Sequence, residues 1–285
     1  MLDGINFGSA FLNPKTLMRF TSFLLFAMIP TFMQAQQEAT TKNFAFKRGE
    51  KLTYRVHYGF VDAGEATIEV TQDNLKFGND PTYHLLGTGK SSGSFDWFFK
   101  VRDRYDSYIS ENTLLPRLFM RRVDEGGFII NQDYSFNQVT NQVSVKRDGT
   151  DKPRNAINKK FEIPDACHDI LSAFYFARNA DISKVKIGDV ITLNSFFDEE
   201  LFPMQVKIVG REVLKTKMGK IRCIALRPII QKGRVFKEEE DLTMWVSDDM
   251  NRIPVRLQAN VLVGSIKMDI KSATNLANPL ALVEK

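Results

Sequence analysis

The sequence predicts a mostly β fold: a curved antiparallel sheet or open β-barrel with one packed helix at about residues 165–179. Three observations lead to this prediction. Apolar and polar residues alternate in many short segments, turn-forming residues separate these segments, and one apolar stretch breaks the alternation. The 285 residues are 43% hydrophobic and 26% charged, a composition that supports a buried core and excludes a disordered or fibrous chain.

The first 35 residues have the pattern of a secretory signal peptide. A basic start precedes an apolar stretch at residues 20–32, and the small residue Ala35 follows this stretch as the expected cleavage site. Met18 begins a tighter version of the same pattern, so residues 1–17 are interpreted as an over-extended start. The apolar stretch is shorter than the ~20 residues that a membrane-spanning helix needs. We therefore expect cleavage after Ala35 and a periplasmic protein without a transmembrane anchor; the alternative is an uncleaved anchor.

Alternation is clearest in five segments of the mature chain. They lie at residues 52–58, 66–70, 204–208, 253–259 and 266–270. Each predicts a strand with one buried and one solvated face. Turn residues such as Glu125-Gly126-Gly127 and Asp148-Gly149 recur between such segments, which favours hairpins and an antiparallel meander.

The stretch at residues 165–179 is the helix candidate. Asp165 suits its N-cap, and Arg178 suits its C-terminal end. This helix is apolar on more than one side, so we expect it inside the curved sheet or across its mouth. The polar, basic stretch 146–160 is the best break in the chain. Residues 36–285 are nevertheless expected to form one β-rich domain with a continuous sheet and frayed ends at 36–43 and 275–285.

The two cysteines, Cys167 and Cys223, exclude a disulfide-dense scaffold and a zinc site of four thiolates. An oxidising compartment would allow them to form a disulfide. Two separate buried thiols are the alternative. The spacing of the two residues in the sequence leaves both open.

Motifs that would indicate catalysis or metal binding are weak. Residues 89–93 match G-x-S-x-G, but the α/β context that a nucleophile elbow needs is missing. The three histidines, His57, His84 and His168, lack metal-binding spacing. The cluster Cys167-His168-Asp169 is interpreted as capping and packing, and no metal or cofactor is expected.

Acidic runs occur at residues 198–200, 238–241 and 248–249. A glycosidase needs two carboxylates that face each other across a cleft, whereas acidic runs at strand ends are usually solvated turns. No enzymatic activity is expected. The charge balance of 39 basic and 34 acidic residues contains no block of like charges, so no nucleic-acid partner is expected either.

Aromatic residues form two clusters, at residues 95–99 and 174–176. Most such residues fill cores, because they bury a large area. Some of them would also line an apolar cavity between the sheet and the helix. The candidates for contact with a ligand are Trp97, Phe98, Phe99, Phe174, Phe176 and Trp245.

Several segments together resemble a bacterial family of exported proteins, domain of unknown function 3108. The matching segments are residues 49–54, 63–66, 167–178, 242–249, 252–256 and 264–266. The resemblance implies export in Gram-negative bacteria and a β-rich fold, and it supplies no catalytic residues. The C-terminal segments are also distantly similar to periplasmic lipoprotein carriers, whose open barrels surround an apolar cavity.

These observations together predict an exported, non-enzymatic periplasmic protein that binds a lipid, a lipoprotein or another apolar or amphipathic component of the envelope. The first alternative is a module that binds an envelope protein through a sheet edge or surface. The second alternative is a carbohydrate-active enzyme.

Overall fold

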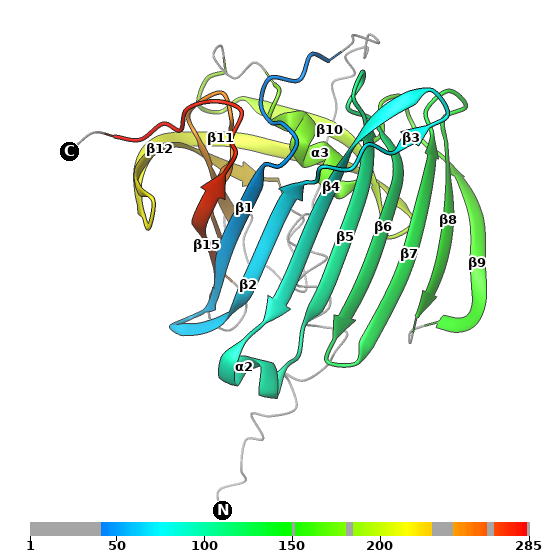
Figure 1. Cartoon of the computed structure of the whole chain (residues 1–285), viewed down its shortest axis with the longest axis horizontal. Helices are drawn as coiled ribbons and strands as arrows, with labels where there is room; N and C mark the ends of the chain where they lie inside the picture. Colours follow the sequence, from blue (N-terminus) through cyan, green and yellow to red (C-terminus); the bar gives the residue numbers. More distant parts are fainter. Residues whose placement is uncertain (1–40, 150–151, 181–184, 230–241, 261–264, 284–285) are drawn as a thin grey trace, which may run out of the picture.

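The structure, a computed structural model, describes residues 41–149, 152–180, 185–229, 242–260 and 265–283 (Figure 1). These residues form one large sheet and two helices. The strands are β1 (Lys51–Tyr58), β2 (Val61–Val70), β3 (Lys76–Phe77), β4 (Asp80–Ser91), β5 (Arg102–Ser110), β6 (Pro116–Glu125), β7 (Phe128–Asn137), β8 (Gln142–Gly149), β9 (Lys152–Glu162), β10 (Val190–Phe197), β11 (Glu200–Thr216), β12 (Gly219–Pro228), β13 (Leu242–Ser247), β14 (Pro254–Asn260) and β15 (Ser265–Thr274). The helices are α2 (Gly93–Phe98) and α3 (Ile170–Ala177).

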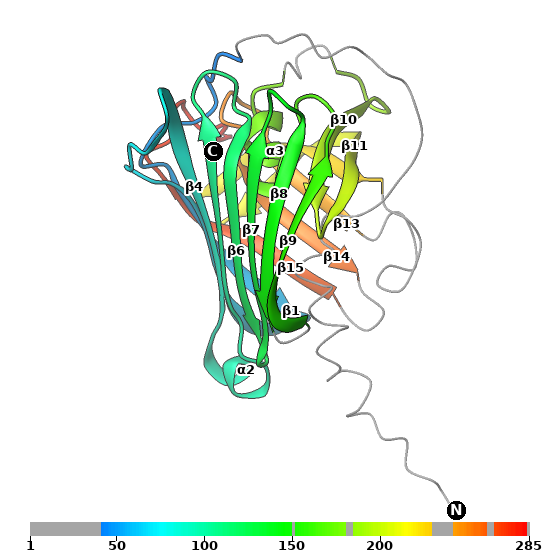
Figure 2. The same cartoon turned by 90° about the vertical axis from the view of Figure 1, so that its right-hand side faces the viewer.

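The sheet is antiparallel and strongly curved (Figures 1 and 2). Its strand order is β10-β11-β12-β13-β14-β15-β1-β2-β4-β5-β6-β7-β8-β9, and β3 pairs with β4 outside this path. Most neighbours are consecutive in the chain, and the pairing of β15 with β1 joins the two ends of the meander. Strands β9 and β10 form the two edges, so the sheet is not closed into a barrel. The predicted open, curved antiparallel sheet is confirmed.

The alternating segments are strands, as predicted. In β1, Leu52 and Tyr54 are buried whereas Lys51 is exposed, and Tyr54 lies opposite Ile270 of β15. The basic stretch 146–160, predicted as the best break, instead lies largely within the paired strands β8 and β9. The sheet continues on both sides of this stretch, as the sequence indicated.

The packed helix is shorter than the predicted span 165–179. Its N-cap is Asp169, and the prediction of Asp165 is wrong. Asp165 and Ala166 form a turn, and His168 pairs with β10 before the helix begins. The backbone N–H of His168 donates to the carbonyl of Asn194 (2.9 Å), and the N–H of Phe196 donates to the carbonyl of His168 (2.8 Å). Backbone groups engaged in this parallel bridge are not free to begin a helix.

A capping box starts α3. The Asp169 carboxylate accepts hydrogen bonds from the backbone N–H groups of Leu171 (2.8 Å) and Ser172 (2.9 Å), and the Ser172 hydroxyl accepts from the N–H of Asp169 (2.9 Å). The Ser107 hydroxyl of β5 donates to the same carboxylate (2.6 Å). This contact fixes the start of the helix to the inner face of the sheet, and α3 lies within the curve (Figure 2).

The second helix, α2, was not predicted. It follows β4 and occupies the turn before β5, at the opposite end of these strands from α3 (Figure 1).

The C-terminal segment is ordered against the rest of the protein, although residues 275–285 were expected to fray. The N–H of Asn278 donates to the Asn251 side chain (2.8 Å), and the N–H of Ala281 donates to Asp249 (2.7 Å). Leu282 forms an isolated bridge with Ile221. The prediction of a frayed end is wrong for residues 275–283, because these backbone groups have partners in the β13–β14 turn and β12.

The predicted signal peptide, residues 1–35, lies outside the described residues. Within the described ranges, neither helix is long and apolar enough to cross a bilayer.

Cys167 and Cys223 are both free and buried. They lie in two different apolar clusters, Cys167 with Phe196 and Phe197, and Cys223 with residues of β1 and β14. The structure therefore shows the second alternative, two separate thiols, and not a disulfide. Burial raises the pKa of each thiol to about 12.

Candidate functional site

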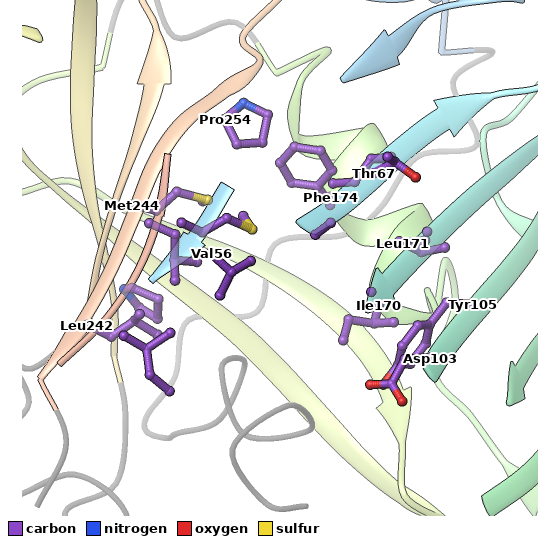
Figure 3. A pocket seen from close by; sticks show the side chains of 18 of the residues that line it. Val56, Thr67, Asp103, Tyr105, Ile170, Leu171, Phe174, Leu242, Met244 and Pro254 are labelled. Carbon is purple, nitrogen blue, oxygen red and sulfur yellow. The ribbon is translucent and has the colours of Figure 1, made fainter. Parts of the chain in front are cut away.

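A cavity of about 670 Å³ lies between α3 and the inner face of the sheet. Its walls come from both halves of the meander. Figure 3 shows Val56, Leu242 and Met244 on one side, with Ile170, Leu171 and Phe174 of α3 on the other. Almost all of these groups are hydrocarbon or aromatic, so the cavity favours apolar ligands.

Helix α3 is held in place at both ends, so its cavity-lining residues have a fixed position. Ser107 holds the start of the helix through Asp169. At the other end, the Arg178 guanidinium donates to both oxygens of the Glu50 carboxylate, at 2.6 and 2.8 Å. Both side chains of this ion pair are almost completely buried.

The structure brings three of the six predicted ligand-contact residues to the cavity. Phe98, Phe99 and Phe174 line it. Phe98 is also 68% exposed, and a residue that is both exposed and cavity-lining marks the mouth. The mouth is therefore at the α2 end of the sheet.

The other three candidates lie elsewhere. Trp97 is 84% exposed and packs edge-on against Phe98, just outside the cavity. Phe176 packs on the His168 ring, and the Trp245 indole N–H donates to Glu212 (2.6 Å). On β13, Met244 and Val246 line the cavity but Trp245 does not. Trp245 therefore points to the opposite face, because successive strand residues alternate.

Two buried carboxyl groups, Asp103 of β5 and Glu125 at the end of β6, also line the cavity. A third lining carboxylate, Glu65 of β2, is partly exposed and forms an ion pair with Lys271. In the β5–β6 register Val101 lies opposite Glu125, so Asp103 and Glu125 are diagonal neighbours on one face. Asp103 is 7% exposed and Glu125 is fully buried. The two side chains hydrogen-bond to each other.

Sequence reasoning missed this pair. The two residues are far apart in the chain, and only the β5–β6 register brings them together. The available signal was the alternation of inward-facing and outward-facing residues along β5. Asp103 alternates with Tyr105 and Ser107 on the inner face, so an acidic residue occupies a position where an apolar one is expected.

Burial and the proximity of Glu125 raise the pKa of Asp103 to about 8. A hydrogen bond between two carboxyl groups needs a proton, and the raised pKa keeps one on the pair near neutral pH. The Arg121 guanidinium, also buried, donates to Asp198 of the β10–β11 turn (2.8 Å).

The remaining sequence motifs have structural roles. The Ser91 hydroxyl in the G-x-S-x-G match hydrogen-bonds to Asp96 and accepts from the N–H of Val101 (2.8 Å), which holds α2 against the strands. Asp198 and Glu199 form ion pairs with Arg121 and Arg147. Residues 238–241 lie outside the described part of the chain.

His168 is completely buried, and burial lowers its pKa to about 3, so its ring is neutral. His84 contacts Asp106 through Nε2 (2.8 Å) and Asp73 through Nδ1 (2.8 Å). Among the described residues, no group of three or more His, Cys, Asp or Glu side chains is arranged to hold a metal ion.

Three solved structures are similar to this chain to different degrees. A β-barrel-like protein of domain of unknown function DUF1849 from Brucella abortus superposes with a TM-score of 0.53 at 8% identity, over 80% of this chain and 98% of that one. A protein described as exported, with a YmcC-like fold, from Bacteroides fragilis gives a TM-score of 0.35 at 8% identity, over 81% and 98% of the two chains. A protein described as a lipoprotein, from Parabacteroides distasonis, gives 0.36 at 11% identity, over 84% and 100%.

The first of these similarities supports an open, barrel-like architecture. No curated protein matches the sequence. One family model, described as protein of unknown function (DUF3108), matches residues 53–271, which is most of the chain, and the resemblance seen in the sequence is therefore confirmed: the protein belongs to this family.

Proposed function

We propose that this protein is an exported, non-enzymatic component of the cell envelope that binds an apolar or amphipathic molecule, a lipid or the acyl chains of a lipoprotein, in the cavity beneath α3. The observation that carries the proposal is the cavity of about 670 Å³ with its nearly continuous apolar lining. This volume is within the range of about 300–1,000 Å³ that small-molecule sites occupy.

The energetics favour a hydrocarbon chain. Each CH₂ group that leaves water for an apolar environment contributes about 0.8 kcal/mol, so a chain of ten such groups gains roughly 8 kcal/mol before the costs of immobilisation. The lining residues make dispersion contacts and demand few hydrogen bonds in return. Such a site selects for apolar length more than for a particular chemical group.

The mouth supports transfer from a lipid phase. Trp97 and Phe98 are exposed on α2, and Phe60 is fully exposed in the β1–β2 turn at the same end of the sheet (Figure 1). Exposed aromatic residues near a cavity mouth suit contact with a membrane surface or an apolar carrier. The N-terminal pattern at residues 1–35 supports export to a compartment where such surfaces occur.

A glycine substitution tests the proposal. Gly89 lines the cavity, and a Cβ built there would meet only the Asp103 Cβ, at 3.9 Å. Gly89→Leu therefore fills cavity volume without a backbone clash. Gly210→Leu is the matched control: it makes the same change in β11, in open space and outside the cavity.

Binding of the neutral fluorophore N-phenyl-1-naphthylamine is measured for the two variants and the wild type, together with native mass spectrometry of the purified proteins. We expect Gly89→Leu to weaken binding at least about tenfold, because loss of a few buried methylene contacts has that effect. Gly210→Leu should bind as the wild type does. Equal binding by all three proteins would show that the cavity is not the site and would favour docking of an envelope protein on the outer surface.

A further inference from the structure

The carboxyl pair at the cavity wall requires an explanation, because an apolar binding site gains nothing from it. Asp103 Oδ1 is buried and, apart from the hydrogen bond that the Asp103 carboxyl group shares with Glu125, has no hydrogen-bond partner among the described residues. A buried oxygen that accepts no hydrogen bond from a donor group is unfavourable, and native proteins hold few of them. A ligand that supplies a donor would remove this cost.

The position of the pair relates it to the mouth. From the α2 end, Val101 lies just before β5, and Asp103, Tyr105 and Ser107 follow along the inner face of β5. Ser107 contacts the start of α3. Figure 3 shows Asp103 beside Tyr105, with the α3 residue Ile170 close to both. The pair therefore lies just inside the mouth, between the exposed rim and the deep apolar part of the cavity.

The charge of the pair determines which groups it accepts. With one shared proton, the pair carries a single negative charge near neutral pH and offers oxygen acceptors toward the cavity. The nearby cation Arg121 is engaged with Asp198 (2.8 Å). A hydrogen-bond donor therefore meets an acceptor in a low-dielectric environment, whereas an anionic group meets like charge.

We propose that Asp103 and Glu125 bind the head group of the amphiphile whose chain fills the cavity, and that this head group is a hydrogen-bond donor, an ammonium or hydroxyl group, and not a carboxylate or phosphate. This inference rests on the function proposed above and adds the polar specificity of the same site. The chain then extends inward along β5 toward Leu171 and Phe174, and the head group lies near the rim.

Three ligands with one chain length test the inference: decylamine, decanol and decanoate. Their affinities for the full chain are measured at pH 7 by displacement of N-phenyl-1-naphthylamine. The proteins are the wild type, the double variant Asp103→Asn/Glu125→Gln, and the control Asp124→Asn. Asp124 is adjacent to Glu125 but does not line the cavity, and its carboxylate accepts from the N–H of Gly127 (3.3 Å).

In the wild type we expect decylamine and decanol to bind at least about tenfold more tightly than decanoate. The double variant should reduce this preference to about threefold or less, and Asp124→Asn should keep it. The comparison of ligands in the wild type is informative even if the double variant does not fold.

Two results would overturn the inference while leaving the proposed function intact: decanoate that binds the wild type as tightly as decylamine, or a preference that is unchanged in the double variant. If none of the three ligands displaces the fluorophore, the proposed function itself fails. The two kinds of failure are therefore distinguishable.

Discussion

The buried ion pair between Arg178 and Glu50 makes the strongest stability prediction. The guanidinium makes four hydrogen bonds, two to Glu50 (2.6 and 2.8 Å), one to the carbonyl of Asn251 (2.7 Å) and one to the carbonyl of Ala45 (3.0 Å). Through them the C-terminal end of α3 contacts the N-terminal segment, the residue before β1, and the β13–β14 turn. Loss of Arg178 leaves a carboxylate buried without its cation.

The magnitude follows from this burial. Removal of one member of a buried ion pair costs about 3–5 kcal/mol, mostly because the remaining charge has lost its partner. Arg178→Met retains much of the stem that packs near the Phe46 and Tyr175 rings, so packing contributes little to the loss. Glu50→Gln should cost a similar amount. The double variant, which removes both charges, should lose about 2–3 kcal/mol less than the sum of the single losses.

The assay is urea unfolding of the wild type and the three variants at pH 7, followed by circular dichroism. Equal m-values would show that the change is in stability and not in the unfolding mechanism. A loss below about 1 kcal/mol for Arg178→Met, or single losses that simply add, would contradict the assignment of the pair as a coupled anchor of α3.

Three further predictions concern the core and its titrating groups. Leu171→Asp places a charge beneath α3, so soluble expression should fall sharply. The control Leu171→Met should express normally. Soluble Leu171→Asp with an unchanged melting temperature would contradict the packing described. Burial lowers the pKa of His84, but its hydrogen bonds to Asp106 and Asp73 outweigh burial and the net shift is upward. The wild type should therefore be more stable than His84→Gln, with the full difference present below about pH 6.5 and a decline as the pH rises through the raised pKa of His84. Urea unfolding at several pH values measures this difference. A difference that grows with pH would refute the reasoning. Because burial raises the pKa of Cys167 and Cys223 to about 12, iodoacetamide should label both thiols at pH 8 only after unfolding, as mass spectrometry would show; rapid labelling of the native protein would contradict their burial.

Strand alternation was sufficient to predict the fold class, because one buried and one solvated face leave a period of two in the sequence. The helix was found for a related reason: residues 170–177 are too apolar for a surface segment. Its start was misplaced because Asp165 and Asp169 are both good caps. Only the pairing of His168 with β10, a long-range contact, decides between them.

The sequence predicted an apolar cavity between the sheet and the helix, but it identified only some of the residues that line it. Aromatic clusters occur both in packed cores and in cavity walls. The alternation of side chains along a strand decides which of these two places an aromatic residue occupies. Trp245 lies on the outer face for this reason, and Trp97 is exposed because it belongs to a short helix that the sequence did not reveal. Asp103 and Glu125 could be paired only with the register of β5 and β6 in hand.

The gap in strand pairing between β9 and β10 affects what fixes the width of the interior. In a closed barrel the number of strands fixes the circumference, because every strand is bonded on both sides. Here the circumference is set at the seam where His168, just before α3, meets β10 through two backbone hydrogen bonds. Side chains also cross this seam: Asp198 and Glu199 of the β10–β11 turn form ion pairs with Arg121 of β6 and Arg147 of β8. The width of the interior at this seam therefore depends on side-chain contacts and two backbone hydrogen bonds, and not on a strand ladder.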